Sequence, residues 1–92
     1  MSEQLFKPSS NRLTFATVQS ESKRLHALLN EQNTSLFRLD LHDVTQCDSA
    51  GLALIIETKR LCKQHNRALS IDGVTKAIYA LAEFCGVEAL LK

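Results

Sequence analysis

The residues whose types and spacing best suggest chemistry are the adjacent Asp48 and Ser49. They lie between an alternating, strand-like run that ends at Leu41 and a run with helical spacing that begins near Gly51. A hydroxyl at the start of a helix can cap the helix, accept a phosphate, or form part of a surface that contacts another protein. The other residues of the chain indicate which of these three roles is favoured.

Covalent catalysis by Ser49 would need a general base within hydrogen-bond reach. The available histidines are His26, His42 and His65. The predicted topology places His26 in the middle of one helix and His65 at the far end of another. His42 is nearer in sequence, but Ser-Ala-Gly lacks the leading glycine of the nucleophile elbow. We therefore predict that the protein is not an enzyme and that His42 and His65 are surface residues.

Cofactor and metal sites have little support in the sequence. The three glycines form neither of the glycine-rich phosphate-binding motifs. Cys47, Cys62 and Cys85 are odd in number and lack metal-ligand spacing, which indicates buried free thiols. Asp40 and Asp43 have no companion ligands, so we interpret them as solvated acids. We expect no cofactor and no metal.

Composition and charge exclude further classes. The chain has 92 residues and a formal net charge of +1 with acids and bases interspersed, which predicts no binding to nucleic acid or to an anionic membrane surface. Residues 1–8 lack the pattern of a signal peptide, and the apolar runs, such as residues 52–56, are too short to span a bilayer. We expect a cytoplasmic protein with no direct membrane insertion and a single domain over residues 1–92.

The elements that must position Asp48 and Ser49 follow from periodicity. Two strand-like runs, residues 5–7 and 13–18, flank a turn-rich segment at 8–11 and predict a hairpin. The remaining periodic segments predict strands at 36–41 and 69–71, helices from 20 to about 30–33, over 51–65 and over 76–85, and a last helical turn at 88–91. The expected core is aliphatic, with five larger side chains in it: Phe6, Phe15, Phe37, Tyr79 and Phe84.

This order of elements predicts an α/β domain with helices packed on a mixed sheet and right-handed parallel crossovers. The loops that follow the carboxyl ends of strands usually carry function in such sheets, and residues 36–41 lead toward Asp48 and Ser49. A simple cap by either residue, worth about 1 kcal/mol, is the favoured use on physical grounds. A phosphate-accepting or docking role for Ser49 stays open beside it.

Two stretches of the chain resemble the STAS domain. Leu36-Phe-Arg-Leu-Asp-Leu-His-Asp-Val44 followed by Cys47-Asp-Ser-Ala-Gly-Leu52 is similar to its strand and Asp-Ser-x-Gly-Leu signature. Ala77-Ile-Tyr-Ala-Leu-Ala-Glu-Phe-Cys-Gly-Val87 is similar to its closing helix. The resemblance implies a non-catalytic protein-binding module with a mixed four-stranded β-sheet and helices packed mainly on one face.

Two branches of that family fit the signature. Anti-sigma factor antagonists carry Asp-Ser-[Ser/Thr]-Gly-Leu and are phosphorylated, by a kinase that is also their partner, at the position of Ser49. The MlaB-type subunit of the Mla phospholipid ABC transporter carries Asp-Thr-Gly-Gly-Leu-Ala-Leu-Leu, with the threonine at the contact with the ATPase subunit. This chain reads Asp48-Ser-Ala-Gly-Leu-Ala-Leu-Ile55, so its serine resembles the antagonists and its continuation the transporter subunit.

Other features favour the transporter branch. The chain is short, Ile78-Tyr-Ala-Leu-Ala-Glu-Phe84 is similar to the transporter subunit, and Ala16-Thr-Val-Gln-Ser20 replaces the Gly-Glu-Leu-Asp of the antagonists, although Mla subunits often keep that motif. The resemblance then implies a subunit that binds and regulates the ATPase of a transporter maintaining outer-membrane lipid asymmetry. Such a subunit would lie at the inner membrane only through its partner. The implied contact residues are Asp48, Ser49, Ala50, Gly51 and Leu52.

Overall fold

The computed structural model describes residues 3–31 and 35–91. In chain order, its elements are β1 (Glu3–Phe6), β2 (Arg12–Leu13), α1 (Val18–Glu31), β3 (Leu36–Asp40), β4 (Gln46–Cys47), α2 (Ser49–Gln64), β5 (Ala68–Asp72), α3 (Lys76–Cys85) and the 3-10 helix η1 (Glu88–Leu91). The last two have the predicted bounds, whereas α1 begins earlier than predicted, at Val18. The predicted end of that helix, near residues 30–33, lies partly outside the described residues.

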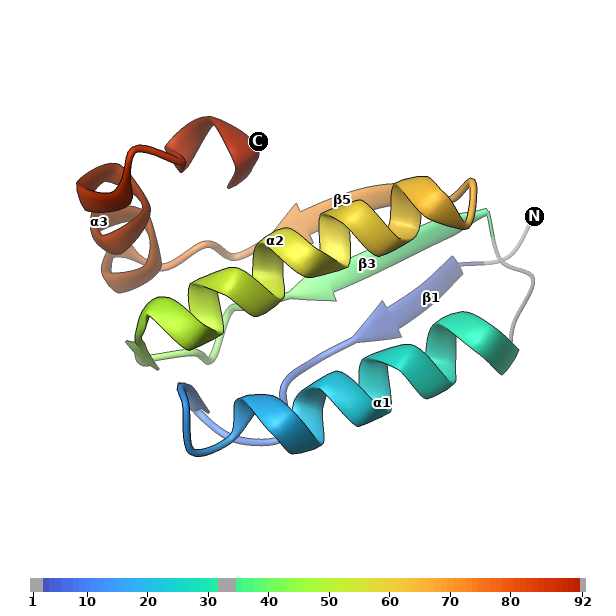
Figure 1. Ribbon diagram of the computed structural model, residues 1–92, viewed down its shortest axis with the longest axis horizontal. Coiled ribbons are helices and arrows are strands. Elements are labelled where there is room, and N and C mark those ends of the chain that lie inside the picture. The colour runs from blue at the N-terminus through green and yellow to red at the C-terminus, as the bar shows by residue number, and fades with distance from the viewer. Residues whose placement is uncertain (1–2, 32–34, 92) are drawn as a thin grey trace.

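The strands form a parallel arrangement with β3 at its centre. β3 pairs with β1 on one side and β5 on the other, and β2 pairs separately with β4. The predicted α/β class is confirmed, and α1 and α2 lie together on one face of β1, β3 and β5 (Figure 1). In detail, the described strands differ from a single mixed four-stranded sheet, because they divide into a three-stranded and a two-stranded part whose pairings are all parallel.

The predicted hairpin between the first two strands is therefore wrong, and the polar contacts of the turn-rich segment explain why. The backbone N–H of Ser9 donates to the buried Glu21 carboxylate at 2.7 Å, which holds the segment against α1. The carbonyl of Asn11 accepts hydrogen bonds from the backbone N–H groups of Thr45 and Gln46 at 2.8 and 3.2 Å. These contacts direct the chain away from β1 and toward β4.

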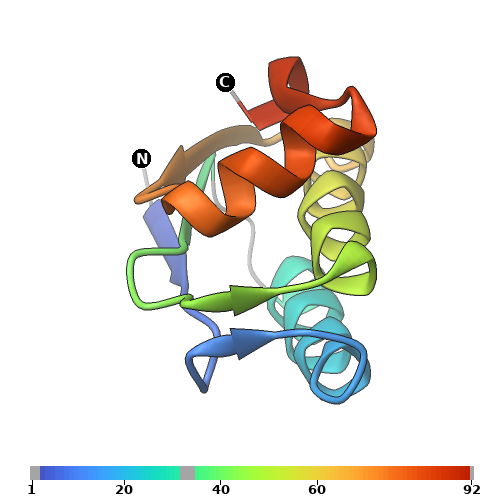
Figure 2. The same ribbon diagram turned by 90° about the vertical axis from the view of Figure 1, so that its left-hand side faces the viewer.

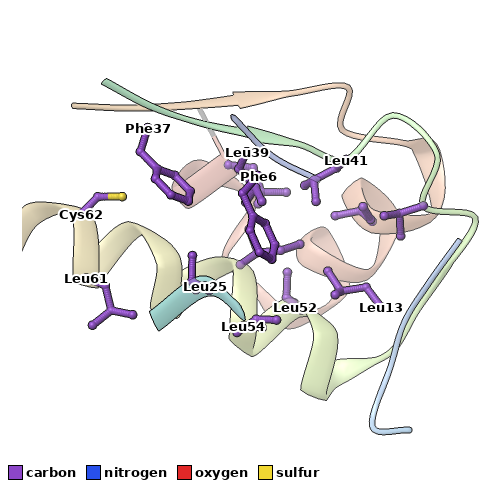
Figure 3. Packing of buried hydrophobic residues seen from close by; sticks show 14 of the residues in the cluster. Phe6, Leu13, Leu25, Phe37, Leu39, Leu41, Leu52, Leu54, Leu61 and Cys62 are labelled. Atoms are coloured by element: carbon purple, nitrogen blue, oxygen red, sulfur yellow. The ribbon is translucent and has the colours of Figure 1, made fainter. Parts of the chain in front are cut away.

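The core fills the space between the sheet and the two long helices (Figure 3). Phe6 and Phe37 stack with ring centroids 6.3 Å apart, and Leu39 lies beside them on the same face of the sheet. On the opposite face, the Arg38 guanidinium donates to the Asp72 carboxylate at 2.9 Å. The alternation of residues 36–41 thus separates a buried face from a charged one, as a half-buried strand requires. None of the helices formed by residues 3–31 and 35–91 has the length and apolarity needed to cross a bilayer.

Only part of the aromatic core was predicted correctly. Phe6 and Phe37 are buried, but Phe15, Tyr79 and Phe84 are 82%, 40% and 91% exposed. The aliphatic residues take the space instead, because α3 buries only Ile78 and Ala82 fully against the domain and leaves its larger aromatics in solvent.

Candidate functional site

Asp48 is the N-cap of α2. Its backbone is extended (φ −114°, ψ −173°), and its Oδ1 atom accepts a hydrogen bond from the backbone N–H of Gly51 at 3.0 Å. The Asp48 carbonyl accepts the first helical bond, from the N–H of Leu52 at 2.9 Å. This geometry confirms the predicted cap and assigns it to Asp48 rather than to Ser49.

The other oxygen of the same carboxylate binds a distant part of the chain. Asp48 Oδ2 accepts a hydrogen bond from the backbone N–H of Phe15 at 2.9 Å, so the carboxylate joins the start of α2 to the turn between β2 and α1. These N–H donors, Phe15 first and Gly51 second, hold the pKa of Asp48 below its usual value, because they stabilise the ionised form.

The turn at residues 14–17 is held by its own threonines. The Thr17 hydroxyl accepts from the backbone N–H of Thr14 at 3.1 Å and donates to the Arg12 carbonyl at 3.0 Å. The Thr14 carbonyl accepts the N–H groups of Thr17 and Val18 at 2.9 and 2.8 Å. Figure 2 shows β2 and β4 side by side, each leading into the start of a long helix at the same end of the molecule.

Phe15 is a member of this site that the sequence pattern did not indicate. The alternation of residues 13–18 indicated a strand, yet the strand ends at Leu13 and Phe15 lies exposed in the turn that follows. The useful signal is the pair Thr14 and Thr17, because hydroxyl side chains that bond nearby backbone groups compete with a strand.

The five predicted contact residues have different exposures. Ser49 is exposed, and Asp48 and Ala50 are half-buried. Gly51 is buried, and a Cβ atom there would lie 1.8 Å from the carbonyl oxygen of Leu13. Leu52 belongs to the core and is 3% exposed (Figure 3). Gly51 and Leu52 are buried in the domain and position the start of α2, and the contact role of the five residues stays a prediction.

The electrostatics around Ser49 are set by the helix start and by Asp48. Ser49 lies on the first turn of α2, a position where free amide groups and the helix dipole favour negative charge. Asp48 already places one carboxylate there, so a phosphate on Ser49 would add like-charge repulsion. Within the described parts of the chain, no histidine hydrogen bonds to Ser49, and no three acidic, histidine or cysteine side chains gather as a metal site would require.

The three histidines and the three cysteines lie elsewhere. His26, His42 and His65 are exposed, as predicted for the latter two. Cys62 is buried as predicted, whereas Cys47 is half-buried and Cys85 is exposed, so the prediction of buried thiols is wrong for Cys85.

Comparison with known proteins agrees with this fold. Residues 10–92 match the family model described as "Mlab, STAS domain", which places the molecule among STAS domains, a class of protein-interaction modules. More particularly, the chain belongs to the MlaB-like STAS family.

A solved structure shows the same fold. It is the crystal structure of a sulfate transporter family protein from Wolinella succinogenes, which superposes with a TM-score of 0.75 over 98% of this chain and 71% of that chain. Its sequence identity of 20% supports a common fold only. A search of curated proteins gave no match.

Proposed function

We propose that this STAS domain binds and regulates the cytosolic ATPase subunit of an Mla-type phospholipid ABC transporter, which maintains outer-membrane lipid asymmetry. In this role the domain is a non-catalytic subunit that resides in the cytoplasm and meets the inner membrane through its partner. The observation that carries the proposal is the exposed Ser49 on the capped start of α2 in a chain of the MlaB-like family.

The geometry of the helix start suits a protein contact. Ala50 is small and Ala53, one turn on, is small and exposed, so a partner backbone can approach closely. The Ser49 hydroxyl can both donate and accept a hydrogen bond. Because Asp48 fixes this turn before any partner arrives, little conformational entropy is lost on binding.

The test uses the transporter ATPase of the same organism and measures its affinity for the purified domain. We expect Ser49→Glu to weaken binding by about tenfold or more, since it sets a second charge beside Asp48 at the contact. Gln64→Glu adds the same charge at the exposed far end of α2 and should bind as the wild type does. Equal binding of all three proteins, or no binding of the wild type, would refute the proposal.

One observation favours a second candidate function. The residue after Asp48 is an exposed serine, which is the residue that a partner kinase of an anti-sigma factor system would phosphorylate. In that case Ser49, and no other serine, carries phosphate in the cell. Intact-mass and peptide analysis of protein from several growth conditions tests this, and a uniform lack of phosphate would speak against the kinase as partner.

A further inference from the structure

An exposed aromatic side chain can supply a large apolar contact area to a partner protein. Phe15, Tyr79 and Phe84 are exposed, the first by 82%. Tyr79 and Phe84 both belong to α3, whereas Phe15 is linked directly to the cap of α2 through the Asp48 carboxylate. Phe15 is therefore the exposed aromatic residue whose backbone is hydrogen-bonded to Asp48, the neighbour of Ser49.

The backbone that carries Phe15 is fixed from both sides. Asp48 holds the Phe15 N–H, and Thr17 holds the neighbouring Thr14 N–H at 3.1 Å. The Phe15 side chain, in contrast, is not packed into the core, since most of its surface faces solvent. An aromatic group on a held backbone has few rotatable bonds, so it can be buried by a partner at small entropic cost.

We propose that Phe15 is the apolar anchor of the same binding surface and that it inserts into an apolar pocket of the transporter ATPase. This inference rests on the proposed function. Ser49 supplies the directed polar contact, and Phe15 supplies the apolar area. Buried aromatic anchors of this kind carry much of the binding energy in protein interfaces, surrounded by contacts that contribute less.

Asp48 has a double role under this proposal. One carboxylate oxygen starts the helix that presents Ser49, and the other holds the turn that presents Phe15. Asp48 therefore helps to set the separation between the two contact groups, together with the pairing of β2 with β4. A partner that contacts both Ser49 and Phe15 would therefore bind two groups whose backbones are already held in place before binding.

The experiment measures the affinity of the intact domain for the ATPase subunit in four forms: wild type, Phe15→Ala, Phe15→Leu and Leu5→Ala. Phe15→Ala keeps the backbone N–H that Asp48 binds, so the fold should be preserved, and thermal unfolding verifies this. We expect Phe15→Ala to weaken binding by about tenfold or more, and Phe15→Leu to recover part of the loss. Leu5 is 56% exposed on the face of the sheet away from α1 and α2, and its truncation should leave affinity unchanged.

The outcomes separate the two proposals. If Ser49→Glu weakens binding while Phe15→Ala binds as tightly as the wild type, the anchor role is overturned and the proposed function stands. If the wild-type domain fails to bind the ATPase at all, the proposed function falls and the anchor role falls with it. Equal losses of affinity for Phe15→Ala and Leu5→Ala would also overturn the anchor role. They would show that removing any exposed apolar side chain weakens binding, wherever it lies.

Discussion

The Asp48 carboxylate and the backbone N–H of Phe15 are joined by a 2.9 Å hydrogen bond across 33 positions of sequence. The contact connects the β2–α1 turn to the start of α2, and it accompanies the close approach of Gly51 to the Leu13 carbonyl. The surface around Ser49 is therefore built from two separate parts of the chain. Its integrity can be tested without knowing the partner.

Replacing Asp48 should make the stability of the domain less dependent on pH. The folded-state pKa of Asp48 is lowered from its ordinary 3.8, first by the Phe15 N–H, so its contribution is present above that value and is lost as pH falls through the folded-state pKa. Asp48→Asn keeps one oxygen for the cap but replaces the other with an NH2 group that cannot accept from the Phe15 N–H. It should lower Tm by a few degrees at about pH 7, and the difference from the wild type should shrink below about pH 4. Denaturation curves across this range measure it.

The control for that experiment is Glu83→Gln, which removes an exposed carboxylate from α3. Its Tm should be close to that of the wild type at about pH 7, because the carboxylate lies on the surface. A difference between Asp48→Asn and the wild type that stays constant down to the lowest pH would contradict the role of the ionised Asp48 carboxylate.

Gly51→Ala should be among the most harmful single substitutions in the chain. The new methyl group would lie 1.8 Å from the Leu13 carbonyl oxygen, so β2 or α2 would have to move. We expect a loss of about 3 kcal/mol in unfolding free energy. Gly86→Ala is the matched comparison, because its φ of 75° strains alanine by about 1 kcal/mol while its Cβ meets nothing within 4 Å. Equal losses for the two variants would rule out the predicted clash.

Two Glu–Arg pairs with the same helical spacing should differ in their effects on stability. The Glu21 side chain is 1% exposed and binds Arg24 and the Ser9 N–H, whereas the Glu57–Arg60 pair lies on the surface. We expect Glu21→Gln to cost about 1–3 kcal/mol and Glu57→Gln less than about 0.5 kcal/mol. Urea unfolding of both variants tests the difference, and comparable losses would mean that burial of Glu21 has no energetic consequence.

The three thiols should react with iodoacetamide in a fixed order. Cys85 is exposed and should be labelled first, and Cys62 is buried and should be labelled last. Burial and the Asp48 charge raise the pKa of Cys47 to about 11, so little thiolate forms near neutral pH and its labelling should speed up as pH rises. Peptide mass spectrometry gives the three rates. Labelling of Cys47 as fast as Cys85 at about pH 8 would contradict its raised pKa.

The sequence predicted most of the helices and the location of the cap because these depend on local patterns. The helix Lys76–Cys85 ends where Gly86 adopts a left-handed conformation, and the predicted cap falls on Asp48 as one of two adjacent candidates. Both are consequences of neighbouring residues within one turn of helix. Such features need no knowledge of the tertiary fold.

The failures concern contacts between distant segments. The segment that resembled a hairpin turn is instead held by Glu21, a helical residue whose charge gave no indication that it would be buried. Phe15 was expected in the core as one of the few large side chains and in a strand because of an alternating pattern, but its backbone is fixed by Asp48 from another part of the chain. Leu52 was expected at the contact surface, although the signature alone does not show which side of the helix faces the sheet.

The parallel strand pairing also bears on how the chain folds. In the described residues, β1 meets β3 and β2 meets β4 only across α1, and β3 meets β5 only across α2. No pair can form as a local hairpin, so each requires closure of a long loop, which slows folding relative to helical domains of similar size. During synthesis, both edges of β3 can therefore be paired only after β5, residues 68–72, has been made. A ribosome-bound chain that stops before this point would expose an unpaired edge of β3.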